Sequence, residues 1–223
     1  MIHKQAYKIL LVEDELLVLE VYRSKLQNLS QKKNMFFSIL EAQNCEEANT
    51  IINNIDRIDI AILDLNIPAS IEHKLNSGID IGKVLIKNYP NIKIIVITAN
   101  DTASFIKKIF EDINPIACLI KNDIDPQEVD KALSFTFNNE VYYCNLVNRF
   151  LKNNPIDKYE LDEVDIILLE QLLIGTTSKE LENIVLLSKR TIEYRKKLLK
   201  EKLGVPDKSL RTLLTKAKEL KII

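Results

Sequence analysis

Five short stretches of the chain are dense in branched apolar residues, a pattern typical of strands that are buried on both faces of a sheet. These predicted strands cover residues 8–12, 36–42, 59–64, 92–97 and 115–120. The third strand ends abruptly on Asp64, and Pro68 follows four positions later. An unpaired charge at the end of a buried strand is strongly unfavourable. Asp64 therefore needs a partner from elsewhere in the chain.

Between and after these strands the apolar residues fall at helical spacing. The predicted helices run over residues 16–29, 44–54, 78–89, 101–112 and 125–137, and the fourth is capped by Asn100 or Asp101. Asn44 with Glu47, and Asp125 with Pro126, form helix-start patterns. Strands that alternate with helices over short connections predict an α/β fold with a doubly wound, five-stranded parallel sheet.

The predicted strands end on polar side chains. Glu13 and Asp14 follow the first strand, Asp64 ends the third, Thr98 the fourth and Lys121 the fifth. In a doubly wound sheet the functional site lies beyond the carboxyl ends of the strands, where the strand order switches. A single polar residue could simply end its own strand, but four such ends predict one shared site.

The alternation of strands and helices stops at about residue 138. Residues 139–157 are predicted to form a linker that includes a helical turn or two, and everything beyond is predicted to be helical. Four helices are expected over residues 161–174, 177–185, 188–203 and 209–220, the last starting at Asp207 or Ser209. The predicted organisation is therefore an α/β domain over residues 1–138, the linker, and an all-α domain over residues 158–223.

Composition narrows the classes of protein. Hydrophobic residues make up 46% of the chain and charged residues 28%, as in a soluble globular protein. The chain has no apolar run of about 18 residues, and its first six residues lack the apolar core of a signal peptide, so we expect a cytoplasmic location. Cys45, Cys118 and Cys144 are widely spaced, which favours reduced thiols. With only His3 and His73, a histidine-based catalytic triad or metal site is not expected.

The residues at the strand ends favour phosphoryl chemistry. Three carboxylates at adjacent strand ends repel one another and need a counter-cation, and carboxylate oxygens suit Mg²⁺. Lys121 adds a positive charge and Thr98 a hydroxyl, so the set can bind a phosphoryl group. Asp64 is the best candidate nucleophile because it is single and central, whereas Glu13 and Asp14 are a pair of metal ligands.

Residues 8–137 resemble the receiver domain of bacterial two-component response regulators, which has a flavodoxin-like fold. The resemblance rests on Glu13-Asp14, Asp64-Leu-Asn-Ile-Pro68, Thr98-Ala99 and Lys121. It implies that Asp64 accepts a phosphoryl group from a sensor histidine kinase. It also implies that Mg²⁺ is held by Glu13, Asp14, Asp64 and the backbone carbonyl of Asn66, that Thr98 is the switch hydroxyl, and that Lys121 pairs with the phosphate.

Two departures from the receiver pattern lie near the predicted site. The loop over residues 69–77 is longer than in most receivers, and it is either a tolerated surface insertion or an element that shapes kinase choice or phosphate access. Cys118 stands three positions before Lys121, where receivers usually place Tyr or Phe as a rotamer switch. Signal relay through an aromatic flip is therefore not expected.

Charge is concentrated in one predicted helix of the second domain. Residues 155–223 hold 14 Lys and Arg against 12 Asp and Glu, and the rest of the chain holds 17 against 20. Seven of the basic residues fall between positions 189 and 202: Lys189, Arg190, Arg195, Lys196, Lys197, Lys200 and Lys202. A solvated face would explain this pattern alone, but a helix with one apolar face and one basic face also fits a DNA major groove.

Residues 161–223 resemble the four-helix helix-turn-helix domain of the LuxR/NarL type. The resemblance rests on Gly175, Lys179-Glu180-Leu181, Leu187-Ser188, Thr191-Ile192 and Lys202-Leu203-Gly204-Val205. It implies that residues 188–203 contain the recognition helix. The residues expected to contact DNA are Lys179, Lys189, Arg190, Thr191, Tyr194, Arg195 and Lys197.

Three residues depart from that second pattern. Glu193 stands where lysine is frequent, and it could accept a hydrogen bond from cytosine or repel a phosphate. Arg195 replaces a common histidine. Glu182 replaces a small residue, usually alanine, between two helices, where a larger side chain bears on how those helices pack.

Together these patterns predict a bacterial DNA-binding response regulator that is not an enzyme. Phosphorylation of Asp64 is expected to favour a form that dimerises and binds double-stranded DNA, with no membrane partner. One alternative is a haloacid-dehalogenase-like phosphatase, but that class carries a second aspartate where this chain has Asn66. Another is a receiver-type signalling protein whose helical C-terminus is a protein-interaction module that does not bind DNA.

Overall fold

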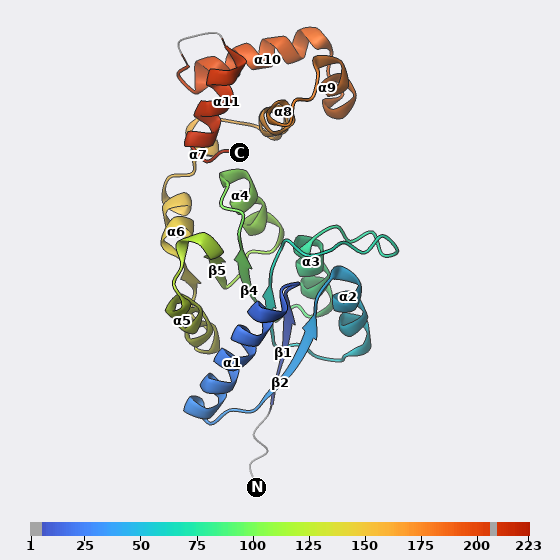
Figure 1. Ribbon diagram of the computed structural model, residues 1–223, viewed down its shortest axis with the longest axis vertical. Coiled ribbons are helices and arrows are strands. Elements are labelled where there is room, and N and C mark those ends of the chain that lie inside the picture. Colours follow the sequence, from blue (N-terminus) through green and yellow to red (C-terminus); the bar gives the residue numbers. More distant parts are fainter. Residues whose placement is uncertain (1–5, 206–208) are drawn as a thin grey trace. The chain divides into compact units, whose positions relative to one another are not determined.

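The computed structural model describes residues 6–205 and 209–223. These residues form two compact units (Figure 1). The first contains residues 6–100 and 108–148, and the second contains residues 101–107, 149–205 and 209–223.

The first unit is built on a parallel sheet with helices on both of its faces. Within the described residues the sheet has six strands in the order β2-β1-β3-β4-β5-β6, and every pair is parallel. The strands are β1 (Tyr7–Val12), β2 (Phe37–Ala42), β3 (Ile60–Leu63), β4 (Lys93–Thr98), β5 (Ala117–Ile120) and β6 (Tyr142–Tyr143). The predicted doubly wound α/β fold is confirmed. The sixth strand was not predicted, because two residues are too short to produce a recognisable hydrophobic pattern.

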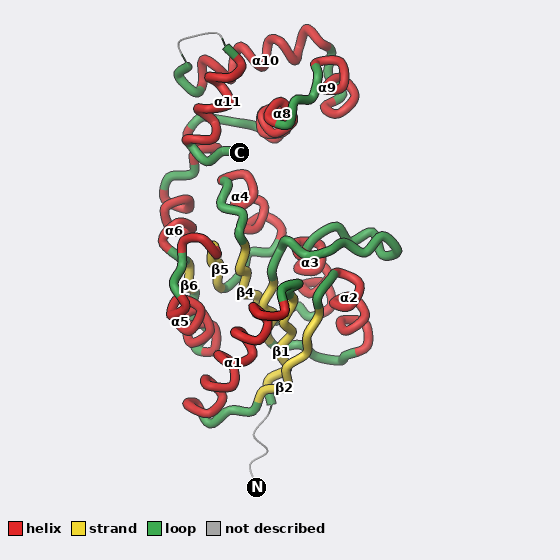
Figure 2. Tube along the Cα trace, viewed as in Figure 1, coloured by secondary structure: helices red, strands yellow, loops and turns green. Residues whose placement is uncertain are grey.

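The central strands are apolar because both of their faces are covered. Every residue of β3 and β5 is at most 1% exposed. Helices α1 (Leu16–Lys33) and α5 (Pro126–Phe137) lie on one face, and α2 (Cys45–Asn54) and α3 (Gly78–Asn88) lie on the other (Figure 1). Figure 2 shows the yellow strands enclosed between these helices. A sheet buried in this way exposes functional groups only at the ends of its strands.

The helix starts of the first unit follow the predicted capping chemistry. The Asn44 side chain accepts a hydrogen bond from the backbone N–H of Glu47 at 2.9 Å. The Asp125 side chain caps α5 by accepting from the backbone N–H of Gln127 at 2.7 Å. Helix α4 (Ala103–Asp112) and the short 3₁₀ helix η1 (Lys121–Asp123) complete the connections between strands.

The second unit is helical, as predicted. Helix α6 (Asn145–Lys152) crosses the boundary between the units, and the others are α7 (Pro155–Lys158), α8 (Glu163–Leu173), α9 (Ser178–Val185), α10 (Lys189–Lys202) and α11 (Leu210–Glu219). The last four are the predicted helices of the C-terminal domain. Strand β6 and helices α6 and α7 fall in the segment predicted as a linker, and the domain boundaries at 138 and 158 remain predictions.

Side-chain caps and glycines fix the ends of these helices. Thr177 and Glu180 form the predicted capping box at the start of α9, and Ser188 caps α10. Ser209 caps α11, whereas the alternative cap, Asp207, lies outside the described residues. After α8, the backbone N–H of Gly175 donates to Leu172 at 3.2 Å with a φ of +88°, which a glycine adopts at low cost.

The apolar faces of α8 to α11 meet in a small core. Leu168, Leu181, Ile192, Leu199 and Leu213 are all fully buried. The second unit therefore has a hydrophobic core of its own.

Two further expectations concern the whole chain. Cys45, Cys118 and Cys144 are buried and free, as predicted. In the part of the chain that the structure describes, no helix is both long enough and apolar enough to cross a membrane.

Candidate functional site

Three carboxylates meet where the strand order of the sheet reverses. Glu13 and Asp14 directly follow β1, and Asp64 directly follows the neighbouring strand β3. The backbone N–H of Asp64 donates to Val12 at 2.8 Å, which brings the ends of the two strands together. Each of the three side chains has an oxygen within 4.8 Å of the other two. Glu13 and Asp64 are buried, and Asp14 is exposed, so one side of this acidic pocket (Glu13, Asp14 and Asp64) faces solvent.

Lys121 is the partner that the buried carboxylates require. It follows β5, and its ammonium Nζ lies 2.6 Å from Oδ2 of Asp64 and 2.9 Å from Oε2 of Glu13. The lysine side chain is 23% exposed, whereas those of Glu13 and Asp64 are 1% and 6% exposed. The predicted cation therefore forms ion pairs with both buried acids.

The acidic pocket carries more negative charge than Lys121 can balance. Burial raises the pKa of Glu13 above its ordinary value, against the hydrogen bond from Lys121, and the negative charge of Asp64 raises it further. For Lys121 burial alone lowers the pKa, but hydrogen bonds to Asp64 and Glu13 outweigh it and leave the pKa raised. Three carboxylates against one ammonium leave a deficit of positive charge, and their oxygens are the ligand type that Mg²⁺ takes. The donor set therefore fits a divalent cation.

The other predicted residues of the pocket also lie at or just after the carboxyl ends of strands. The backbone N–H of Asn66 donates to Oδ1 of Asp64 at 2.9 Å, while the Asn66 side chain is exposed. Thr98 ends β4 and is fully buried, and it pairs with Ile120, the residue before Lys121. Its hydroxyl oxygen accepts a weak hydrogen bond from the backbone N–H of Asn100 at 3.3 Å.

Gly78 is a residue of this site that sequence reasoning did not single out. It begins α3, and its backbone N–H donates to the carbonyl of Leu65 at 3.1 Å. A Cβ atom at this position would lie 2.2 Å from the carbonyl oxygen of Asp64 and 2.7 Å from Cα of Leu65. Only glycine allows this close approach of α3 to the backbone that carries Asp64. The signal in the sequence was a glycine at a predicted helix start, where a capping residue is usual.

The long loop after Pro68 is a closed structure. Ser70 and Leu75 exchange backbone hydrogen bonds of 2.7 and 3.0 Å and form an antiparallel bridge. The Ser70 hydroxyl donates to the carboxylate of Glu46, and Nδ1 of His73 lies 3.0 Å from the same carboxylate. Figure 1 shows the loop projecting between β3 and α3. It is therefore tied to the first turn of α2. Both interpretations of the loop, a tolerated surface insertion or an element that shapes kinase choice or phosphate access, remain predictions.

Cys118 occupies the position at which receivers usually carry an aromatic switch residue. It lies in β5 and is fully buried, and its carbonyl accepts from the backbone N–H of Cys144 at 3.1 Å. Burial raises the pKa of the Cys118 thiol well above its ordinary value. This side chain is therefore a small neutral group within the sheet.

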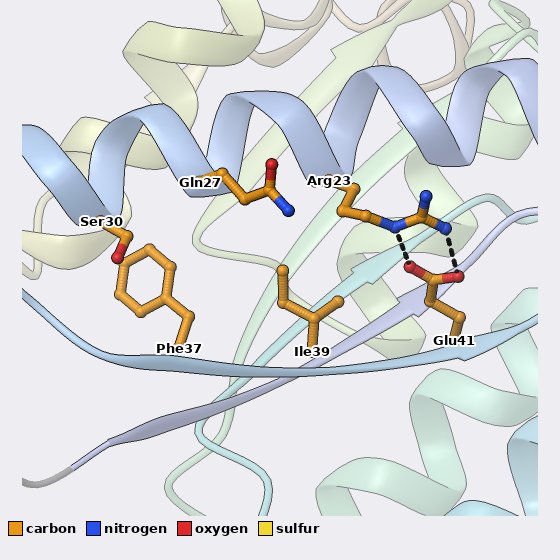
Figure 3. Close-up of a pocket in the computed structure, with 6 residues that line it drawn as sticks. All are labelled: Arg23, Gln27, Ser30, Phe37, Ile39 and Glu41. Atoms are coloured by element: carbon orange, nitrogen blue, oxygen red, sulfur yellow. Dashed lines mark hydrogen bonds and ion pairs between the residues drawn. The ribbon is translucent and has the colours of Figure 1, made fainter.

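A separate hollow lies between α1 and β2, lined by Arg23, Gln27, Ser30, Phe37, Ile39 and Glu41 (Figure 3). The guanidinium of Arg23 donates through Nε and Nη2 to the two oxygens of Glu41, at 2.8 Å each. It also pairs with Glu20. The guanidinium is therefore already engaged by two carboxylates.

In the second unit, the predicted basic helix presents two different faces. Ile192 and Leu199 are fully buried, and they lie seven residues apart on the side of α10 that faces the core. The predicted DNA-contacting residues that the structure leaves exposed are Lys179, Lys189, Arg190, Tyr194 and Lys197. Four of these five lie on α10, so α10 has the apolar and basic faces that its sequence indicated.

The remaining predicted contacts are engaged within the second unit. The Thr191 hydroxyl lies 2.9 Å from that of Ser188 at the start of α10, and the Arg195 guanidinium donates to carboxylates at the start of α8. Glu193 accepts from the Ser178 hydroxyl at 3.2 Å and from Lys196 at 2.9 Å. Glu193 thus links α10 to the start of α9.

A comparison with protein families settles what the first unit is. Residues 9–134 match the family model described as the response regulator receiver domain. The chain belongs to this family. The receiver domain thus carries its acidic pocket at the reversal of strand order, and the helical second unit follows it.

Similar proteins match across both parts of the chain. The nitrate/nitrite response regulator protein NarP of Escherichia coli (strain K12) is 25% identical over 182 residues, which cover 79% of this chain and 80% of NarP. A structure of two RcsB dimers bound to two parallel DNAs has a TM-score of 0.63 at 21% identity and covers 96% of this chain and 98% of that one. RcsB from Salmonella enterica serovar Typhimurium, bound to promoter rprA in the presence of phosphomimetic BeF3⁻, gives 0.61 at 21% identity, over 94% and 97% of the two chains. At these identities the structural likeness shows the shared fold.

Proposed function

We propose that this chain is a DNA-binding response regulator whose receiver domain (residues 1–138) is phosphorylated on Asp64 by a sensor histidine kinase. Its output domain (residues 158–223) then binds double-stranded DNA and regulates transcription. The observation that carries the proposal is the contact of 2.6 Å between Lys121 and Asp64 beside two further carboxylates. The chain acts as a signalling protein rather than as an enzyme, and it works in the cytoplasm, where kinase domains and DNA are both accessible.

The residues around Asp64 fit the transfer of a phosphoryl group. A carboxylate oxygen of Asp64 forms a bond to phosphorus as the bond from phosphorus to the donor histidine nitrogen breaks. Lys121 moves from the carboxylate to a phosphoryl oxygen and balances its charge, while the Asn66 N–H keeps the Asp64 side chain oriented. Thr98, at the end of β4, is the hydroxyl that bonds to another phosphoryl oxygen.

Glu13, Asp14, Asp64 and the backbone carbonyl of Asn66 are the proposed ligands of Mg²⁺. When bound, Mg²⁺ neutralises charge on the transferring phosphoryl group. The support for this set is the excess of negative charge in the acidic pocket and the exposure of Asp14, which opens the pocket to solvent.

Phosphorylation replaces a carboxylate charge by a larger phosphoryl charge, and this shifts a pre-existing equilibrium toward the dimer.

DNA recognition is assigned to α10 and the start of α9. The exposed basic residues Lys189, Arg190 and Lys197, together with Tyr194, form a surface that suits phosphates and base edges, and Lys179 extends it from α9. The RcsB structures similar to this chain contain DNA, and one contains RcsB dimers, which supports DNA and a second copy of this chain as partners. Two half-sites in the DNA would match such a dimer.

Phosphorylation of Asp64 can be tested with a small phosphodonor. Incubation with acetyl phosphate and Mg²⁺ should add one phosphoryl group to the wild-type protein, as measured by intact-protein mass spectrometry. The Asp64→Asn variant should gain none, because an amide is not a nucleophile for phosphorus. Asp59→Asn is the matched control, since Asp59 directly precedes β3, at the opposite end from Asp64, and its side chain accepts a hydrogen bond from the backbone N–H of Lys8. Equal labelling of wild type and Asp64→Asn would contradict the assignment.

DNA binding should depend strongly on salt. The logarithm of the affinity for duplex DNA should fall linearly with the logarithm of the salt concentration, and Lys197→Gln should reduce the slope by about 0.9, the contribution of one phosphate contact. The Lys197 side chain is 74% exposed, so its loss leaves the core intact. Lys87→Gln, on α3, is the control and should not change the slope. An affinity independent of salt would instead favour a protein-interaction module in place of a DNA-binding domain.

A further inference from the structure

We infer that Arg195 is a positioning residue. It is held by Asp162 and Asp165 at the start of α8, and it sets the orientation of α10 without contacting DNA. The α8–α10 clamp is defined as Asp162 and Asp165 together with Arg195 and Lys202. The inference rests on the proposed DNA-binding function and assigns one residue of the basic helix a different role within it.

Within the described part of the chain, the hydrogen bonds of Arg195 are directed toward the start of α8. Its Nη1 atom lies 2.9 and 2.7 Å from the two carboxylate oxygens of Asp162 and 2.8 Å from Oδ1 of Asp165. Asp162 is the N-cap of α8, where its side chain also accepts from the backbone N–H of Asp165 at 2.8 Å. Both acids lie at the positive end of the α8 dipole, which holds their negative charge in place.

The buried carboxylate of Asp165 binds side chains from two turns of α10, Arg195 and Lys202. The residue is only 3% exposed, and its Oδ2 atom accepts from Nζ of Lys202 at 3.0 Å. Lys202 also donates to the carbonyl of Glu160 at 2.8 Å. A carboxylate buried this deeply needs its cations, because removing one partner leaves an uncompensated charge.

Helical periodicity places the clamp on the inner face of α10. Arg195 lies three residues after the buried Ile192, and Lys202 lies three residues after the buried Leu199. Residues three and seven apart share one face of a helix. Arg190, Tyr194 and Lys197, by contrast, are exposed on the other side. The seven basic residues of this segment therefore divide between holding the helix and presenting charge to solvent.

The two possible roles of Arg195 predict opposite changes in DNA affinity when Asp165 loses its charge. If Arg195 contacts DNA, Asp165→Asn removes a negative charge and releases a cation, so DNA affinity should rise and its salt dependence should steepen. If Arg195 positions α10, the same substitution loosens the helix, and affinity should fall with no change in the salt slope.

The test is the salt slope of DNA affinity in the full-length protein. We expect Arg195→Gln and Asp165→Asn each to weaken binding to a mixed-sequence duplex by at least about tenfold while the slope stays within error of wild type. Lys197→Gln, in the same assay, should lower the slope by about 0.9. A loss of slope in Arg195→Gln equal to that in Lys197→Gln, or tighter binding in Asp165→Asn, would overturn the inference.

Two further variants distinguish a loss of the clamp from unfolding of the second unit. The Asp162 side chain is 53% exposed, so Asp162→Asn should leave the second unit folded and weaken DNA binding in the same direction by a smaller factor. Arg195→Lys should partly rescue the affinity lost in Arg195→Gln, because lysine can still reach one acid. Wild-type affinity in Asp162→Asn would count against the clamp.

Thermal unfolding separates the clamp from the proposed function. The falls in melting temperature caused by Asp162→Asn and Arg195→Gln should be less than additive in the double variant, because both remove the same contact. Additive falls would overturn the clamp whether or not the protein binds DNA. Absence of salt-dependent DNA binding in the wild type, with less than additive falls, would instead refute only the DNA-binding function.

Discussion

Replacing Gly78 with alanine is expected to lower the free energy of unfolding by about 3 kcal/mol. The added Cβ would lie 2.2 Å from the carbonyl oxygen of Asp64 and 2.7 Å from Cα of Leu65. Both are backbone atoms, so no side-chain rotation can relieve the overlap. Either α3 or the segment after β3 must move, and the loss of phosphorylation should accompany the loss of stability because that segment carries Asp64.

Gly82 provides a control on the same helix. A Cβ at Gly82 would lie 2.7 Å from Cδ1 of Ile113, which is the far end of a flexible side chain. Gly82→Ala should therefore cost about 1 kcal/mol or less, since alanine also gains about 0.5–1 kcal/mol over glycine inside a helix. Urea denaturation of the two variants measures the difference. Equal stabilities would mean that the contact between α3 and the Asp64 backbone does not constrain the fold.

Replacing Lys121 with methionine should cost about 3 kcal/mol of stability at neutral pH in the absence of divalent metal, because two buried carboxylates lose their shared cation. Lys121 lies 2.6 Å from Asp64 and 2.9 Å from Glu13, and both acids are almost completely buried. Methionine keeps much of the volume of the side chain and removes only the charge. Urea denaturation in the presence of a chelator measures the effect.

Lower pH and bound Mg²⁺ should each restore part of the stability that is lost in Lys121→Met. Burial already raises the pKa of Glu13 above its ordinary value, and Lys121→Met removes the hydrogen bond that opposes this rise. At pH values between the pKa of Glu13 in the unfolded chain and its higher pKa in the folded protein, the folded state binds more protons than the unfolded state. The free energy of unfolding therefore falls as pH rises through that window. The deficit of the variant relative to wild type should therefore be smaller at about pH 5.5 than at about pH 8. Saturating Mg²⁺ should also reduce it; a deficit unaffected by pH and Mg²⁺ would contradict the charge argument.

The helix caps could be predicted from the sequence because they depend on interactions between residues close together in the chain. The capping box of Thr177 and Glu180, the N-caps of α5 and α10 and the αL glycine after α8 each involve residues within a few positions of one another. Strand β6 was missed for the opposite reason. Two residues, Tyr142 and Tyr143, form a strand only because β5 lies beside them.

The candidate site was predictable to the level of its strand ends. Carboxyl ends of parallel strands meet at one edge, so Glu13, Asp64 and Lys121 could be expected to converge before any distance was known. The choice of ion-pair partner was not predictable, because Lys121 could have faced either acid, and it faces both. The need for glycine at position 78 depends on the path of α3 past β3, which no local pattern records.

By itself, the sequence determined the order of strands and helices, the set of chemical groups at the strand ends and the two faces of the basic helix, since hydrophobic period and capping act over a few residues. Only the tertiary structure decided which charges are engaged. The pairing of Arg195 with Asp162 and Asp165 joins residues about thirty positions apart, and Lys121 reaches Asp64 and Glu13 across the sheet. Such pairs depend on where helices and strands come to lie, and the composition of a segment does not encode that.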